Sequence, residues 1–239
     1  MYWRIADLRV RLEGIALLWL ALVGTGIVLT VVIGDTRAVE MVSHSRWVAE
    51  HYALIHALTK YSMYPFYVLF LVVLILGWLR RDKYLRLIGW AYLFAQLAGA
   101  AFTVRILKIL TGHARPSVQD PAMIDAWVGP SMDNAFHSFP SGHTADLFTS
   151  AVFLAILAPN LLLRIVLLAF AVLIGLTRIA LSGHYPVDVT GGAMIGGLTT
   201  LLVVAYWLFP RLADLEQGKY FLGRYSDINY AKIITLLCA

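Results

Sequence analysis

Residues 15–33 form an apolar run without a single charged side chain, long enough to cross the hydrocarbon core of a bilayer. A spanning helix needs about 20 apolar residues. A secretory signal peptide has a shorter apolar core, of about 7–15 residues, and a small-residue cleavage site follows it. No such cleavage site follows this run, so we expect it to be a retained first transmembrane helix.

Five further stretches resemble this first run in their low charge. The chain is 60% hydrophobic and only 14% charged, whereas soluble domains carry about 25% charged residues. We therefore predict an all-α polytopic membrane protein, a helical bundle of six transmembrane helices that forms a single domain over residues 1–239. The later spans are predicted over residues 61–79, 87 to beyond 104, 141–158, 161–177 and 186–210.

Two segments outside these spans are amphipathic. Residues 35–60 are expected to be a loop with a short interfacial helix, where Trp and Tyr side chains favour the membrane surface. His44, His51 and His56 lie in this segment without a carboxylate pair or cysteine beside them, so a solvated helix is favoured over a metal site. Residues 211–239 form an amphipathic tail.

Lys and Arg residues fix the predicted orientation. Most of the 19 Lys and Arg residues lie before the first span, in the turn after the second, after the fourth and in the tail. By the positive-inside rule both termini are then cytoplasmic. The long central loop and the connection between the fifth and sixth spans fall on the outer, periplasmic face. This loop charge explains the net charge of +5, and with no basic run or stripe we expect no nucleic-acid partner.

Three cations, Lys108, Arg115 and Arg178, lie in or beside apolar segments on the predicted outer side. Charged side chains at membrane depth are costly and mark function by default, although each could instead snorkel to the interface from a helix end. Arg matches phosphate bidentately and Lys adds a point charge. Their shared side of the membrane favours an anion site.

The segment 140–143 reads Pro-Ser-Gly-His and stands where a helix begins. Free backbone N–H groups and the helix dipole make such a terminus suitable for an anion, and Gly142 lets the backbone approach closely. The alternative role of Ser141 is an ordinary helix cap. His143 is available as a general acid that protonates a leaving oxygen.

His184 and Asp188 flank the predicted start of the sixth span. With Pro186 at the first helical position, the carboxylate of Asp188 falls in the first turn and can reach back to the imidazole. A carboxylate that holds one ring nitrogen leaves the other free to attack. A metal site built from these residues and His143 would be repelled by the three cations, so we expect no metal and no cofactor, and a covalent phosphohistidine route.

These residues form a three-part signature: Lys108-x6-Arg115-Pro116, then Pro140-Ser141-Gly142-His143, then Arg178-x5-His184-x3-Asp188. The signature resembles that of the type 2 phosphatidic acid phosphatase family and covers residues 108–188. The resemblance implies metal-independent phosphate ester hydrolysis in a membrane helical bundle. It also implies that His184 is the nucleophile, Asp188 orients it and His143 is the acid, while Lys108, Arg115, Ser141, Gly142 and Arg178 hold the phosphate. Thr177 stands where the family usually has Ser, and keeps the hydroxyl.

The expected function is hydrolysis of a lipid phosphomonoester or pyrophosphate at the outer face of a bacterial inner membrane. The resemblance allows lipid A 1-phosphate, undecaprenyl pyrophosphate, phosphatidylglycerol phosphate or phosphatidic acid, with the first two preferred. Phosphotransfer to another lipid, anion transport and a vanadate-dependent haloperoxidase are alternatives, although the last is expected to be soluble. The substrate and membrane lipids are the expected partners, and the oligomeric state stays open.

Other residues near the signature receive less specific interpretations. His113 and His137 are expected to be solvated loop histidines, with head-group contact as the alternative. Asp146 is expected to cap the fourth span or to pair with a cation of the site. Gly192-x3-Gly196 is a small-residue face, for which packing inside the bundle is favoured over packing between protomers.

Overall fold

The computed structural model describes residues 5–118 and 120–221. This part of the chain is helical and contains no strand, apart from an isolated antiparallel bridge between His113 and Trp127. The expectation of an all-α membrane protein is therefore confirmed. Five apolar helical segments are long enough to cross a bilayer: Asp7–Ile33, Tyr52–Leu79, Lys83–Thr111, Leu161–Ala180 and Pro186–Glu216.

The fourth of the six predicted spans is the shorter helix α8, Gly142–Leu157, which has 16 residues. It lies against both α9 (Leu161–Ala180) and α10 (Pro186–Leu202), and most of its residues from Thr144 onward are buried. A helix that is apolar all round suits such an enclosed place. Because protein surrounds α8, it does not need the full length of a lipid-facing span. The count of six membrane crossings stays a prediction.

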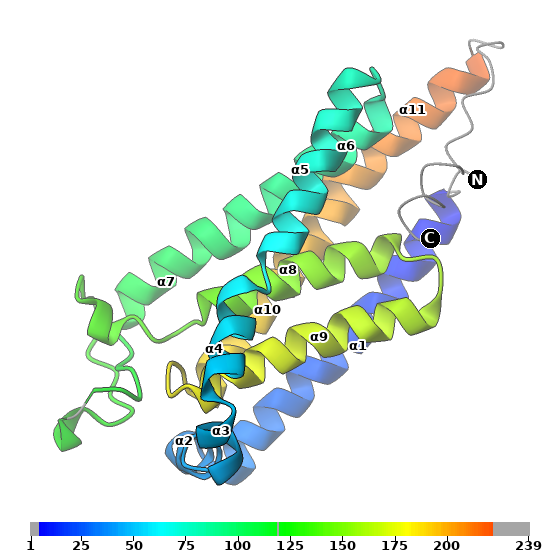
Figure 1. Cartoon of the computed structure of the whole chain (residues 1–239). Coiled ribbons are helices and arrows are strands. Elements are labelled where there is room, and N and C mark those ends of the chain that lie inside the picture. The colour runs from blue at the N-terminus through cyan, green and yellow to red at the C-terminus, as the bar shows by residue number, and fades with distance from the viewer. Residues whose placement is uncertain (1–4, 119, 222–239) are drawn as a thin grey trace.

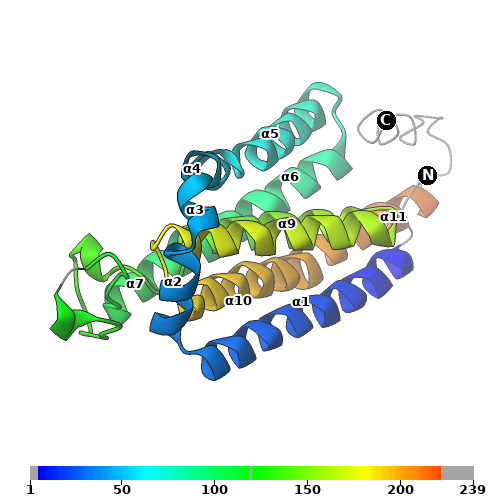
Figure 2. The same ribbon diagram turned by 60° about the horizontal axis from the view of Figure 1, so that its bottom comes forward.

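The bundle places its two kinds of connection at opposite ends (Figures 1 and 2). The long loop between α7 (Val104–Thr111) and α8 lies at one end, beside α2 (Asp35–Ser43) and the turn between α9 and α10. The start of α1 (Ile5–Ile33), the turn between α5 (Tyr64–Leu79) and α6 (Lys83–Gln96), and α11 (Phe209–Phe221) lie at the other. The two polar loops thus share a side, as the span order requires.

The amphipathic segment after the first span contains more helix than expected. In place of one short helix, the chain forms α2, α3 (Arg46–Glu50) and α4 (Tyr52–Tyr61), and α4 continues through a turn into α5. Asp35, at the start of α2, accepts a hydrogen bond of 2.9 Å from the backbone N–H of Val187. This contact fixes the N-terminal end of α10, where the polar residues of the third motif lie.

The third and sixth membrane segments each contain a π-helical insertion that periodicity did not predict. Leu97–Thr103 separates α6 from α7, and Val203–Leu208 separates α10 from α11. Within the first insertion the Thr103 hydroxyl donates to the carbonyl of Ala98, five residues earlier. Such insertions occur often at functional sites, and this one lies between the bundle core and Lys108.

The central loop folds back on itself. The backbone N–H of Ala114 bonds the carbonyl of Ala126, and that of Ser138 bonds the carbonyl of His113. Gly112 begins this return with φ +54°, and a Cβ there would overlap the carbonyl of Gly129, so only glycine fits. Short 3₁₀ turns at Pro121–Met123 and Asn134–Phe136 complete the loop. The predicted tail, residues 211–239, begins within α11, and residues 222–239 of it lie outside the described residues.

Candidate active site

The carboxylate of Asp188 is the centre of the polar cluster. It is fully buried and accepts hydrogen bonds from the Ser138 hydroxyl at 2.5 Å, from the backbone N–H of Tyr185 at 2.8 Å, and from His113 Nδ1 at 2.7 Å. Asp188 is the third residue of α10, so the bond to Tyr185 also caps that helix. These donors hold the buried charge in one orientation.

His184 lies directly beside this carboxylate. Its Nδ1 is 3.6 Å from Asp188 Oδ2 and 3.4 Å from the Ser138 oxygen, and the side chain is almost completely buried. With Nδ1 directed to these oxygens, Nε2 is the nitrogen that remains for other partners. Burial, reinforced by the charges of Lys108 and Arg178 and opposed by Asp188, lowers the pKa of His184 to about 3. The imidazole is therefore neutral near pH 7 and keeps a lone pair.

Lys108 and Arg115 donate hydrogen bonds to the loop that precedes α8. Lys108 Nζ donates to the carbonyl of His137 at 2.6 Å and to that of Ser138 at 3.3 Å. The Arg115 guanidinium donates to the carbonyls of His137 at 3.2 Å and Gly183 at 3.2 Å. The carbonyl of His137, shortly before the second motif, thus links the first motif to the second. The carbonyl of Gly183, inside the third motif, links the first motif to the third.

Arg178 is in the last turn of α9. Its Nε is buried and has no hydrogen-bond partner within the described part of the chain. A Cβ on Gly183 would lie 2.9 Å from its Nη2, so glycine leaves room for the guanidinium. Within the described residues, none of the cations Lys108, Arg115 and Arg178 forms an ion pair with a carboxylate. A buried donor on an unpaired cation suits an anion.

The second motif lies at the start of α8 as predicted. Ser141 is the N-cap residue, but its side chain makes no capping hydrogen bond, so the ordinary cap role is not the one seen. Its backbone N–H donates to the carbonyl of Asp188 at 2.9 Å, and Thr144 donates to its hydroxyl at 3.0 Å. His143 is half-buried, and the charges of all three cations act on it. The structure therefore brings the three motifs together.

His113 corrects the expectation of a solvated loop histidine. Its side chain is 0% exposed, its Nε2 lies 2.9 Å from Asp125 Oδ1, and its ring stacks on Trp127 with centroids 4.0 Å apart. Burial alone would lower its pKa, but Asp188 and Asp125 outweigh burial and raise it. His113 thus joins two carboxylates, one of which also faces His184.

Ser138, Asp125 and Trp127 also belong to the site, although they were not predicted from the sequence. Ser138 stands three residues before Ser141, and its proximity to the second motif was the available signal. Asp125 and Trp127 lie between the first and second motifs and belong to neither, and only the folding back of the loop brings them to His113. No pattern of spacing pointed to them.

His137 and Asp146 also differ from expectation. His137 is 1% exposed, and its Nε2 lies 2.9 Å from the carbonyl of Ser131, so it is not solvated. Within the described part of the chain, Asp146 neither caps α8 nor forms an ion pair with a site cation. Its side chain interacts with the Tyr67 hydroxyl on α5, on the membrane side of the site.

The small-residue face of α10 packs inside the bundle, as favoured from the sequence. A Cβ on Gly192 would lie 3.0 Å from Thr144 Cβ, and one on Gly196 would lie 2.9 Å from the backbone nitrogen of Thr149. Both contacts are with α8. The close approach holds the start of α8 against the start of α10, which carries Asp188.

Comparison with known proteins agrees with this arrangement. The model of the PAP2 superfamily matches residues 88–211. A lipid A 1-phosphatase of Rhizobium etli is 34% identical over 117 residues, which are 48% of this chain and 50% of that protein. The bacitracin transport permease protein BcrC of Bacillus licheniformis is 32% identical over 69% of this chain and 74% of its own length. The chain spans about half the length of the lipid A 1-phosphatases it matches.

A solved structure is also similar. The crystal structure of LpxE from Aquifex aeolicus aligns with 72% of this chain and 95% of its own, with a TM-score of 0.49 and 25% sequence identity.

Proposed function

Since the chain belongs to the PAP2 superfamily, we propose that it is an integral membrane lipid phosphatase that acts through a phosphohistidine intermediate. Its substrate is a lipid phosphomonoester or pyrophosphate, and its site faces the periplasm or cell exterior. The observation that carries the proposal is the buried Nε of Arg178, unpartnered within the described residues, beside a neutral His184. Such a site can receive a phosphate and attack it.

In the first step Nε2 of His184 attacks phosphorus. The P–N bond forms as the P–O bond to the lipid breaks. His143 is protonated once the bound phosphate has offset the charges of the three cations, and it gives this proton to the leaving oxygen. The Nδ1 proton of His184 stays directed to Ser138 and Asp188. Asp188 therefore stabilises the positive charge that develops on the ring.

In the second step water attacks the phosphohistidine. The P–N bond breaks, inorganic phosphate leaves, and His143 now accepts the proton of the water. Throughout both steps Lys108, Arg115 and Arg178 neutralise charge on the phosphoryl oxygens as fixed electrostatics. The backbone N–H groups at the start of α8, from Gly142 onward, add the helix-terminus contribution.

Lipid A 1-phosphate is the preferred substrate, with polyprenyl pyrophosphate second. The relative from Rhizobium etli is named a lipid A 1-phosphatase, and its match to this chain covers 50% of its length, which supports the first choice. Phosphatidylglycerol phosphate and phosphatidic acid complete the set that the motifs allow. A phosphotransferase that passes the phosphoryl group to a second lipid would use the same residues.

Transport is the second candidate function, because BcrC carries a transport name and is similar over most of its length. Transport and hydrolysis differ in their need for a nucleophile. A transport path lined by the cations would continue to work without His184, and would release no phosphate.

The test measures phosphate release by the purified protein and by His184→Ala on all four lipids, with excess chelator present. We expect release by the wild type and a loss of at least about 10³-fold in the variant, as is found when a member of a catalytic triad is removed. A phosphorylated protein trapped by rapid quenching should be found only in the wild type. Retained release in His184→Ala contradicts the covalent route, and release that requires a divalent ion contradicts the absence of a metal.

A further inference from the structure

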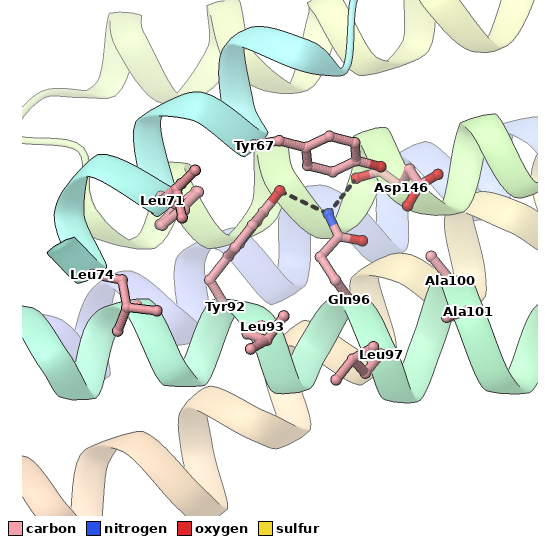
Figure 3. Close-up of a pocket in the computed structure, with 12 residues that line it drawn as sticks. Tyr67, Leu71, Leu74, Tyr92, Leu93, Gln96, Leu97, Ala100, Ala101 and Asp146 are labelled. Carbon is pink, nitrogen blue, oxygen red and sulfur yellow. Dashed lines mark hydrogen bonds between the residues drawn. The ribbon is translucent and has the colours of Figure 1, made fainter.

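A groove of about 510 Å³ lies between α5, α6 and α8, and its lining includes Asp146, three residues after His143 (Figure 3). Toward the turn between α5 and α6 the two helices pack closely at Gly89. A Cβ added at Gly89 would lie only 2.9 Å from Leu74 Cβ. Phe70 and Tyr92 stack at 3.6 Å between centroids along the groove. Its volume is that of an ordinary ligand pocket.

The groove is open toward the lipid. Two of its lining side chains, Leu71 and Leu97, are 57% and 43% exposed, and both lie in segments long and apolar enough to cross the membrane. A molecule that enters from this side comes from the bilayer. The occupant of the groove is therefore a lipid chain.

The groove is mostly apolar, but a few polar side chains lie in its wall, which a purely hydrocarbon occupant does not require. Gln96 Nε2 donates to the Tyr92 hydroxyl at 2.8 Å and to the Ser150 hydroxyl at 3.0 Å, and lies 3.3 Å from the carbonyl of Asp146. Gln96 Oε1 is buried, and it has no hydrogen-bond partner within the described residues. A buried acceptor without a donor is destabilising, so a ligand that supplies the donor is favoured.

The carboxyl group of Asp146 lies in the same wall, with the Tyr67 hydroxyl directed toward it (Figure 3). An ionisable side chain at membrane depth marks a functional site by default. Asp146 follows His143 by three residues on α8, so both lie on the same face of the helix, about one turn apart. A lipid whose phosphate lies near His143 would extend past Asp146.

We infer that this groove binds the chain region of the substrate lipid and recognises a hydrogen-bond donor there, a hydroxyl or an amide N–H, through Gln96 Oε1 and Asp146. The inference rests on the proposed phosphatase function. It selects among the proposed substrates by their chemistry. An acylated amino-sugar lipid with hydroxyacyl chains carries such donors, whereas a polyprenyl chain and the ester-linked chains of phosphatidic acid carry none.

The test compares two synthetic lipids, a glucosamine 1-phosphate acylated with 3-hydroxyacyl chains and its analogue with unsubstituted acyl chains. We expect the wild type to prefer the hydroxylated lipid by about tenfold in kcat/KM, the effect of leaving one buried acceptor unpaired. Gln96→Leu should bring this ratio close to one. Thr103→Val serves as the matched control on the same helical segment, because the Thr103 hydroxyl bonds only its own helix, and it should keep the wild-type ratio.

The outcomes separate the two proposals. Equal rates on both lipids in the wild type overturn the groove inference, because water or a plain chain then occupies it, and leave the phosphatase standing. A ratio that persists in Gln96→Leu also overturns it. Release from neither lipid, nor from any other on the panel, overturns both. The wild-type comparison needs no variant, so it tests the inference even where Gln96→Leu folds poorly.

Discussion

At the scale of single residues, Asp188 serves several partners at once. It holds His113, Ser138 and the N-terminal turn of α10, and it faces His184. A carboxylate with several donors stays ionised despite burial. Its loss therefore affects both the chemistry and the local backbone.

Asp188→Asn should reduce kcat by about 10³–10⁴-fold, because an amide no longer holds the imidazole of His184 in the productive tautomer. Single-turnover phosphate release from the preferred lipid measures the effect. Asp133→Asn is the matched control, since Asp133 caps an exposed turn of the loop. Comparable rates for the two variants would remove the orienting role of Asp188.

His113→Gln should make thermal stability in detergent less dependent on pH. The folded-state pKa of His113 is raised, so its stabilisation is fully present below the unfolded value of about 6.5 and is lost as pH rises through the folded value. The Tm difference between wild type and variant should therefore be larger at pH 6 than at pH 9. Each kcal/mol of difference in the free energy of unfolding corresponds to about 2–4 °C in Tm. Asp125→Asn should show a smaller version of the same change. A difference that is equal at both pH values would contradict the paired-carboxylate account.

At the scale of elements, the contact between α8 and α10 sets the geometry of the site. The second motif begins one of these helices and the third begins the other, so their separation decides whether His143 and His184 face one phosphate. Glycines on α10 allow the close approach. The helix pair therefore acts as a single support.

Gly196→Ala should destabilise the protein by about 1–3 kcal/mol, the usual cost of overpacking, because the added Cβ meets the backbone of Ala145 and Thr149. It should also lower kcat, since α10 must move away from α8. Gly24→Ala on α1 is the matched control, because a Cβ there has no neighbour within 4 Å. Denaturation in detergent and phosphate release measure the two effects, and equal behaviour of the variants would contradict this packing argument.

Much of this site was predictable because its signals lie in short, continuous stretches of the sequence. The apolar runs indicated the helices, and the three motifs indicated which helix ends carry polar chemistry. The roles of His113 and Ser138 were missed because they depend on the return of the central loop, whose backbone bonds join residues far apart. The π-helical insertions and the groove at Gln96 were missed for a similar reason, since they depend on how α6 meets α8 and α10.

At the scale of the whole molecule, the polar loops and the described ends of the chain lie at opposite ends of the bundle (Figure 2). The distribution of Lys and Arg predicts that the site end faces outward. The structure shows which loops share an end of the bundle.

Labelling in right-side-out membrane vesicles tests this orientation. With the single native Cys238 replaced by Ser, a membrane-impermeant maleimide should label Ser131→Cys in the central loop. It should label Lys83→Cys, at the first residue of α6, only after the vesicles are opened. The reverse pattern would place the site in the cytoplasm.

The three cations described above have no carboxylate among their described contacts, and this has a consequence for turnover. These cations repel one another, and the nearby charge of Asp188 offsets that of Lys108 and Arg115 only in part. A bound phosphate should relieve the remaining repulsion and stabilise the fold by RT ln(1 + [L]/Kd). Released inorganic phosphate should bind in the same way as the substrate phosphate, so we expect product inhibition, with turnover in the cell set by how quickly free phosphate leaves the membrane surface.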